Sequence, residues 1–159
     1  MESHTDRIIQ IWAVRHGQTI ANTKNMCQGH TGGQLTDLGV KQAAVLGKRL
    51  ASEKFGICYV SDLARTKETF KVIIEQNSDN EAKELDVVYS PLLREKSGGV
   101  FEGNTLKALS DAAKRSKLPI RDYRPQEGEC WNDVHKRAAE LLLIVFYDVF
   151  VLKRPGKIF

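Results

Sequence analysis

The 159-residue sequence contains few cysteines and no long apolar run. Cys27, Cys58 and Cys130 lie far apart without paired spacing, which argues against a disulfide framework and a zinc module and suits a reducing compartment. The richest apolar run, 141–152, is shorter than the roughly 18 residues of a spanning helix and is interrupted by Asp148. The first residues do not resemble a secretory signal, because Glu2, Asp6 and Arg7 are charged and the apolar run 8–14 is short. We therefore expect a cytoplasmic protein without membrane contact.

A large excess of one charge sign is also missing. There are 24 basic and 20 acidic residues, for a net charge of +4, and residues 149–159 alone contribute three basic residues and no acid. Residues 104–125 are also basic, and form either a solvated surface or a cover that attracts phosphates. The basic excess lacks the interleaved aromatic residues typical of nucleic-acid binding. We therefore expect no nucleic-acid partner. The basic charge remains compatible with a small anionic substrate.

The length and composition favour one globular domain. At 42% apolar and 28% charged residues, the chain has the make-up of an ordinary folded protein. A domain typically holds about 100–200 residues, so residues 1–159 are interpreted as a single domain, with 149–159 as an atypical tail.

Apolar runs alternate with helical patterns along the chain. The predicted strands are 8–14, 57–60 and 85–89, and helices are expected to begin near Thr36, Ser61, Thr105 and Trp131. This alternation predicts an α/β fold, in which three α/β/α layers surround a mostly parallel sheet. The last helix is predicted to bury one face, formed by Val134, Ala138, Leu141, Leu142 and Val145.

Several charged side chains follow the predicted strands. Arg15 and His16 follow the first strand, Arg65 lies just after the second, and Glu95 follows the third. In open parallel sheets, ligands bind beyond the carboxyl ends of the strands. An imidazole can attack phosphorus, guanidinium groups can hold phosphoryl oxygens, and a carboxyl group can exchange the proton of the leaving oxygen. The pattern therefore favours phosphoryl transfer through histidine.

Each of these residues also has a plainer interpretation. His16 could be a structural residue that follows a strand. Arg65 could pair at the surface with Glu68 or Asp62, and Glu95, which lies between two basic residues, could belong to a solvated charge cluster. We favour the site interpretation because all of these residues follow a strand.

The motif Arg15-His16-Gly17-Gln18-Thr19 with Asn22 resembles the signature of the histidine phosphatase (phosphoglycerate mutase-like) superfamily. Further segments resemble that family in the same order, across roughly residues 8–140: 28–29, 35–43, 61–66, 93–95, 101–103 and 128–129. The segments 61–69, 94–96 and 101–103 look most like the TIGAR-type fructose-2,6-bisphosphatases.

The resemblance implies a phosphoglycerate mutase-like fold and a role for each matching residue. It implies that His16 is the phosphohistidine nucleophile and Glu95 the proton donor and acceptor. It implies phosphate binding or pocket lining by Arg15, Asn22, Gln28, Gly29 and Arg65. It further implies hydrolysis of a small phosphorylated substrate, such as fructose 2,6-bisphosphate, without a metal or another cofactor.

The sequence departs from the family pattern at a second histidine. Family members carry a His-Gly pair after a later strand, but the four histidines here are His4, His16, His30 and His135. None of them follows an apolar strand and precedes a glycine. We therefore expect a family member truncated at its C-terminal end. An impaired or inactive short isoform and a phosphoglycerate mutase-type phosphotransferase remain open alternatives, and oligomeric state is not predicted.

Overall fold

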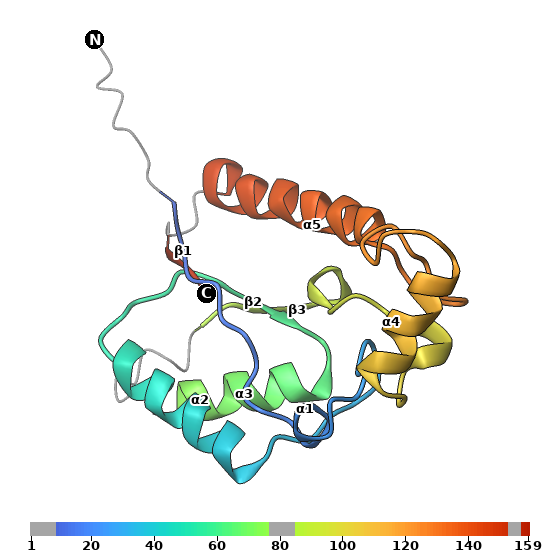
Figure 1. The fold of residues 1–159 in the computed structure, drawn as a ribbon. Coiled ribbons are helices and arrows are strands. Elements are labelled where there is room, and N and C mark those ends of the chain that lie inside the picture. The colour runs from blue at the N-terminus through green and yellow to red at the C-terminus, as the bar shows by residue number, and fades with distance from the viewer. Residues whose placement is uncertain (1–8, 77–84, 153–156) are drawn as a thin grey trace.

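The computed structural model describes residues 9–76, 85–152 and 157–159. Figure 1 shows a central sheet with helices on both sides. Strand β2 (Cys58–Ser61) pairs in parallel with β3 (Val87–Ser90). This part of the chain therefore has the predicted α/β architecture.

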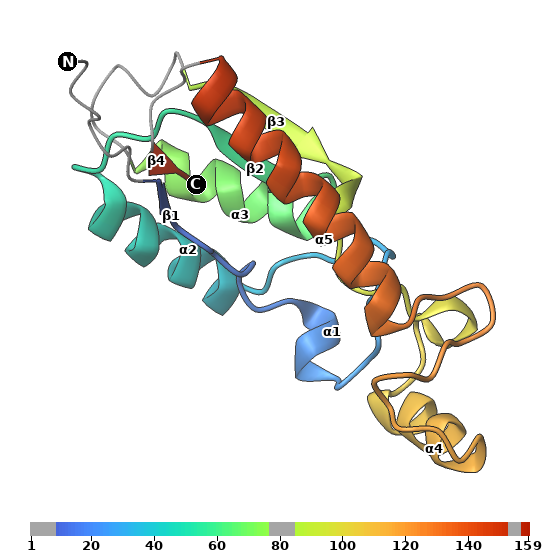
Figure 2. The same cartoon turned by 90° about the horizontal axis from the view of Figure 1, so that it is seen from above.

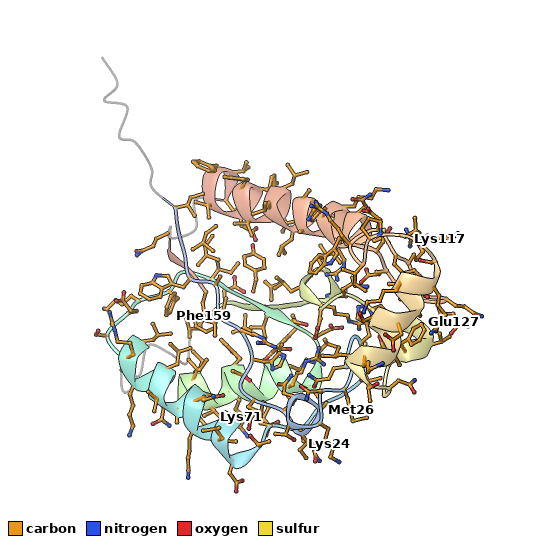
Figure 3. The ribbon with its side chains drawn as sticks, in the orientation of Figure 1. Lys24, Met26, Lys71, Lys117, Glu127 and Phe159 are labelled. Carbon is orange, nitrogen blue, oxygen red and sulfur yellow. The ribbon has the colours of Figure 1, made fainter. Side chains whose placement is uncertain are left out.

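A second parallel pair lies beside the first and is joined to it by a bridge. Strand β1 (Gln10–Ile11) pairs with β4 (Lys157–Ile158), and a parallel bridge joins Ile57 to Ile158. The bridge places β4 between β1 and β2, in the order β1-β4-β2-β3. Phe159, labelled in Figure 3, continues this pairing because it accepts from the Tyr59 amide and donates to the Ile57 carbonyl.

Helices cover the sheet unequally. Helices α2 (Asp37–Leu50) and α3 (Ala64–Glu75) lie on one face, and α5 (Trp131–Phe146) crosses the other (Figure 2). Helix α4 (Leu106–Arg115) lies at one end of the molecule, away from the sheet. The shorter elements are α1 (Ile20–Thr23), η2 (Pro91–Leu93), η3 (Gly99–Phe101) and η4 (Tyr147–Val151).

Successive side chains of β2 belong to two hydrophobic cores, one on each face of the sheet. Tyr59 packs with Val145 and Val149 on the α5 side, whereas Cys58 and Val60 pack with Phe70 on the α3 side. Successive side chains of a strand point to opposite faces, so four buried residues in a row serve both layers. A run without polar alternation is typical of a parallel strand covered on both faces.

Two glycines bring the loop after β1 against α2. A Cβ atom at Gly17 would lie 2.4 Å from the carbonyl oxygen of Gly39, and one at Gly39 would lie 2.1 Å from that of Gln18. The Gly17 amide also donates to the Thr69 hydroxyl on α3, at 3.1 Å. These contacts fix the backbone beside His16, because neither glycine has room for a side chain.

Some predicted boundaries differ from the structure. Thr36 caps α2 as expected, and its hydroxyl accepts from the Gly39 amide at 3.1 Å. Ser61 is not the cap of α3; that position is Leu63, and Ser61 instead ends β2. The strand expected at 8–14 is shorter, since β1 covers only two of the described residues, and β4 was not anticipated within the chain.

The buried face of α5 also differs from the prediction. Ala138 and Leu142 are exposed, whereas Arg137 is only 14% exposed. The inward stripe therefore includes a charged residue, which a search for apolar periodicity passes over.

Among the helices in the described residues, none combines the length and apolar character needed to cross a membrane.

Candidate active site

His16 lies in the loop that follows β1, with its imidazole partly buried. Its Nδ1 is 2.7 Å from the carbonyl oxygen of Gly17. A carbonyl oxygen only accepts, so Nδ1 carries the proton and donates it. In the neutral ring, Nε2 then holds the lone pair, which is the form required of a nucleophile.

The surroundings of His16 favour the neutral ring. Burial is the main cause that lowers the pKa of the His16 imidazole below 6.5, and the positive charges of Arg65 and Arg15 lower it further. The hydrogen bond to Gly17 and the charge of Glu95 act in the opposite direction, but they are outweighed. These effects favour the unprotonated imidazole at neutral pH, and the same two arginines place positive charge near it.

Arg65 is the most deeply buried charged side chain of the site. It begins in the first turn of α3 and is fully buried. Its guanidinium donates to the carbonyl oxygens of Thr31 and Gly29, at 2.9 Å each, and to Glu95 Oε2 at 3.0 Å. Among the described residues, its Nε has no hydrogen-bond partner. The plainer alternative of a surface pair with Glu68 or Asp62 is wrong, because this arginine is buried and faces the loop after β1.

Glu95 follows η2, and its side chain is 54% exposed. Its carboxylate accepts from Arg65, while its main-chain carbonyl accepts from the side chains of His30 and Arg137, at 2.9 and 3.1 Å. One side of the carboxylate thus faces a fixed arginine and the other faces solvent. This arrangement leaves the group able to exchange a proton.

Arg15 and His16 also line a cavity of about 270 Å³. The cavity is lined by residues of both α3 and α5 and of the strands, and most of its wall is apolar, with Val60, Phe70 and Val145 among the lining residues. Arg15 itself is exposed. The structure therefore places the two residues of the motif at the boundary between an apolar space and solvent.

Asn22, Gln28 and Gly29 are packed into the loop itself. Asn22 Oδ1 accepts from the Thr19 amide at 2.9 Å and closes the capping box of α1. Gln28 Oε1 accepts from the Thr19 hydroxyl at 2.8 Å, and both side chains are buried. Gly29 presents its carbonyl to Arg65. These three residues shape the loop around Arg65, and their contact with a phosphate stays a prediction.

Two acidic side chains support the site, although the sequence alone assigns them no role in it. Glu102 Oε1 accepts from the amides of His30 and Gly98 and from the Ser97 hydroxyl. Asp62 accepts a forked pair of hydrogen bonds from Arg94, at 2.7 and 2.5 Å, and the bond from Arg94 is the main reason that the pKa of Asp62 is lowered. Both interactions tie down the loop that carries Glu95.

The other histidines occupy different places. His30 lies against the main chain of Glu95, 3.7 Å from Glu129 Oε2, and His135 is exposed on α5. His4 lies outside the described residues. Within the described parts, neither His30 nor His135 is among the groups that shift the pKa of His16. The same parts contain no cluster of three or more His, Cys, Asp or Glu that could hold a metal ion.

Comparison with known proteins identifies the family. Residues 11–145 match the model of the histidine phosphatase superfamily (branch 1). The chain is 31% identical over 137 residues to the probable fructose-2,6-bisphosphatase TIGAR A of Danio rerio, which covers 86% of this chain and 53% of that protein. It is 34% identical over 145 residues to fructose-2,6-bisphosphatase TIGAR of Bos taurus, covering 91% and 52%.

A solved structure agrees with this assignment. The phosphoglycerate mutase from Bacillus anthracis str. Sterne superposes with a TM-score of 0.81 at 26% identity, over 94% of this chain and 72% of that one. The fold is therefore phosphoglycerate mutase-like. The chain spans about half the length of the curated relatives it matches. Since the family model covers most of the sequence, the chain belongs to the histidine phosphatase superfamily.

Proposed function

We propose that the chain is a phosphatase that forms a phosphohistidine on His16. The observation that carries the proposal is the His16 imidazole. Its Nδ1 donates to the Gly17 carbonyl, so Nε2 holds the lone pair, and the positive charges of Arg65 and Arg15 act on the ring. A neutral imidazole nitrogen can attack phosphorus while guanidinium groups offset the phosphoryl charge.

The proposed reaction has two steps. In the first, His16 Nε2 forms a bond to phosphorus while the bond between phosphorus and the ester oxygen breaks, and protonated Glu95 gives its proton to that oxygen. In the second, a water oxygen bonds to phosphorus, Glu95 takes the water proton, and the N–P bond breaks. Arg15 and Arg65 offset the phosphoryl charge in both steps, and no metal is required.

The proposed substrate is a small sugar phosphate of the fructose 2,6-bisphosphate type, handled in the cytoplasm. Its support is the likeness to the two fructose-2,6-bisphosphatases. The exposed Arg15 beside His16 suits a substrate that carries a second phosphate, because a guanidinium at the mouth of a site attracts anions.

The test is labelling with a phosphate ester whose phosphoryl group carries ³²P. We expect a label that is acid-labile and stable to base, and that disappears in His16→Ala. His135→Ala is the matched control, because His135 is exposed on α5 and should leave the label unchanged. A label that persists in His16→Ala would contradict the proposal.

A weakened or inactive enzyme is the second candidate. It is favoured by the positions of His30 and His135, which lie against Glu95 and on the surface of α5 and so leave His16 without a histidine partner among the described residues. Loss of one member of a preorganised charge site typically costs about 10²–10³ in rate. Turnover of this chain compared with a version extended by a strand and a His-Gly pair separates full from impaired activity.

A phosphoglycerate mutase-type transfer is a third candidate, supported by the likeness to the Bacillus anthracis mutase. Product analysis with 3-phosphoglycerate distinguishes it. A hydrolase releases inorganic phosphate, whereas a mutase returns the phosphoryl group to the other hydroxyl oxygen of the glycerate.

A further inference from the structure

Arg137 projects from α5 onto the loop that carries Glu95. Its NH1 donates to the carbonyl oxygen of Leu92 at 2.8 Å, and its NH2 donates to that of Glu95 at 3.1 Å. The side chain is only 14% exposed. One guanidinium therefore holds two main-chain carbonyls, on either side of the turn that leads to the carboxylate.

Glu129 fixes the guanidinium and the far end of the same loop. Its Oε1 accepts from Arg137 Nε at 3.0 Å, and its Oε2 accepts from Arg137 NH2 at 3.1 Å and from the Ser97 amide at 2.8 Å. Burial raises the pKa of Glu129, but the hydrogen bonds from Arg137 and Ser97 outweigh it and keep the net pKa below the usual value. The carboxylate thus stays charged, as the forked pair requires.

We propose that Arg137, held by Glu129, is a positioning residue that orients Glu95 for proton transfer. The inference rests on the proposed function, because it takes Glu95 as the proton donor. The backbone of Glu95 is fixed from the α5 side by Arg137, and its carboxylate is fixed from the α3 side by Arg65. An exposed carboxylate on a loop needs such support to keep the geometry that proton transfer demands.

The geometry requires an arginine. The planar fork reaches two carbonyls and one carboxylate with three nitrogens at once. A lysine has one ammonium at the end of a flexible stem and cannot satisfy these acceptors together. We therefore expect Arg137→Lys to behave like Arg137→Met and not to rescue the loop.

The kinetic test compares two esters on the purified chain. Fructose 2,6-bisphosphate has a leaving oxygen that needs a proton, whereas p-nitrophenolate leaves without one. Loss of a general acid costs about 10²–10⁴ in rate, so Glu95→Gln should lower kcat/KM by that factor for the sugar ester and far less for p-nitrophenyl phosphate. We expect Arg137→Met to show the same selectivity, with a loss of at least about tenfold for the sugar ester.

Three further variants sharpen the kinetic test. Glu129→Gln keeps an acceptor for the Ser97 amide and serves as the milder change, should Arg137→Met fail to fold. Adding Arg137→Met to Glu95→Gln should cost little more than Glu95→Gln alone, because both changes act on one proton transfer. Lys136→Met is the matched control, since Lys136 is the exposed neighbour on α5. Equal losses on both esters would overturn the positioning role.

A second readout does not depend on activity. Amide hydrogen exchange over residues 92–98 should become faster in Arg137→Met and Glu129→Gln and stay unchanged in Lys136→Met. Unchanged exchange in the first two variants would overturn the inference. If the unaltered chain hydrolyses neither ester, the proposed function fails on that result, and the exchange measurement alone decides whether Arg137 holds the loop.

Discussion

At the scale of single residues, Arg65 and Arg15 act on His16 and on an anionic substrate in opposite ways. Both arginines lower the pKa of the imidazole because they repel its proton, and both would attract a phosphoryl group. The same two charges therefore add to the effect of burial on the imidazole and would also serve the proposed phosphate site.

The titration of His16 follows from this arrangement. We expect its imidazole to titrate with a midpoint below 6.5, the ordinary value for the group. A ¹H–¹³C NMR titration measures this midpoint, with the His16 signal identified as the one lost in His16→Asn. A midpoint at or above 6.5 would contradict the burial seen in the structure.

The same pKa shift affects stability. The folded state favours neutral His16, so its contribution to the free energy of unfolding is complete above pH 6.5 and is lost as the pH falls from 6.5 toward the lower pKa of the folded state. Urea unfolding of the chain and of His16→Asn over this pH window measures the effect. The difference in unfolding free energy between the two should change as the pH falls from neutral.

At the scale of elements, the glycines of the loop after β1 and of the turn after η3 differ in how strictly the backbone requires glycine. Gly29 has a φ of +49°, and a Cβ atom there would lie 2.1 Å from Glu102 Oε1. Gly103 has a φ of +81° but open space around it, and Gly32 has open space and no positive φ. A side chain at Gly29 would meet both backbone strain and steric overlap, one at Gly103 would meet strain alone, and one at Gly32 would meet neither.

Alanine substitutions at the three glycines should therefore rank in order. We expect Gly29→Ala to lower the free energy of unfolding by about 2–4 kcal/mol and Gly103→Ala by about 1–2 kcal/mol, since L-residues pay this cost in the left-handed region. Gly32→Ala should change it by less than about 1 kcal/mol. Urea denaturation of the three variants measures the order, and equal losses at Gly29 and Gly32 would contradict the structure.

Substitutions on the buried and on the exposed face of α5 should lower the free energy of unfolding by different amounts. Val145 is 5% exposed against Tyr59 and Val149, whereas Leu143 is 70% exposed. Val145→Ala should lower the free energy of unfolding by about 2 kcal/mol through lost burial and a residual cavity. Leu143→Ala is the control, because surface changes usually stay within about 0.5 kcal/mol. Thermal or urea unfolding provides the measurement.

Much of the fold could be predicted from the sequence, because apolar periodicity and strand-end position are local signals. They located β2, α2 and the order of elements, and they placed His16, Arg65 and Glu95 at one edge. Arg137 was missed because a charged residue breaks the apolar stripe of α5, although it lies between Val134 and Leu141 at helical spacing. Two of its partners are main-chain carbonyls, which leave no mark in a sequence.

The pairing of β1 with β4 was missed for a different reason. The two strands are two residues long each, and residues far apart in the sequence create the pair. A two-residue strand has no periodicity to detect. The position of Ile158 depends on tertiary contacts, since it packs with Tyr59 and Val145.

At the scale of the whole molecule, an occupied anion site should stabilise the folded chain. A ligand at ten times its dissociation constant adds about 1.4 kcal/mol to the free energy of unfolding. We expect inorganic phosphate to raise Tm in the unaltered chain and to have a much smaller effect in Arg65→Lys, which keeps the charge but loses Nε and the fork.

Sodium chloride at matched ionic strength is the control for this measurement, because it screens surface charge without a specific contact. An equal rise in Tm with chloride and with phosphate would contradict a built phosphate site at Arg65.

The central position of β4 has a consequence for folding order. Ile158 fills the space between Ile11 and Ile57, so the middle of the sheet joins segments from opposite ends of the sequence. Contacts at such separation close large loops and slow the folding rate. During synthesis, β2, β3 and α3 can pair early, but β1 waits for a partner until residue 158 has left the ribosome. The centre of the sheet therefore cannot form until residue 158 is available, and the earlier segments expose that centre until then.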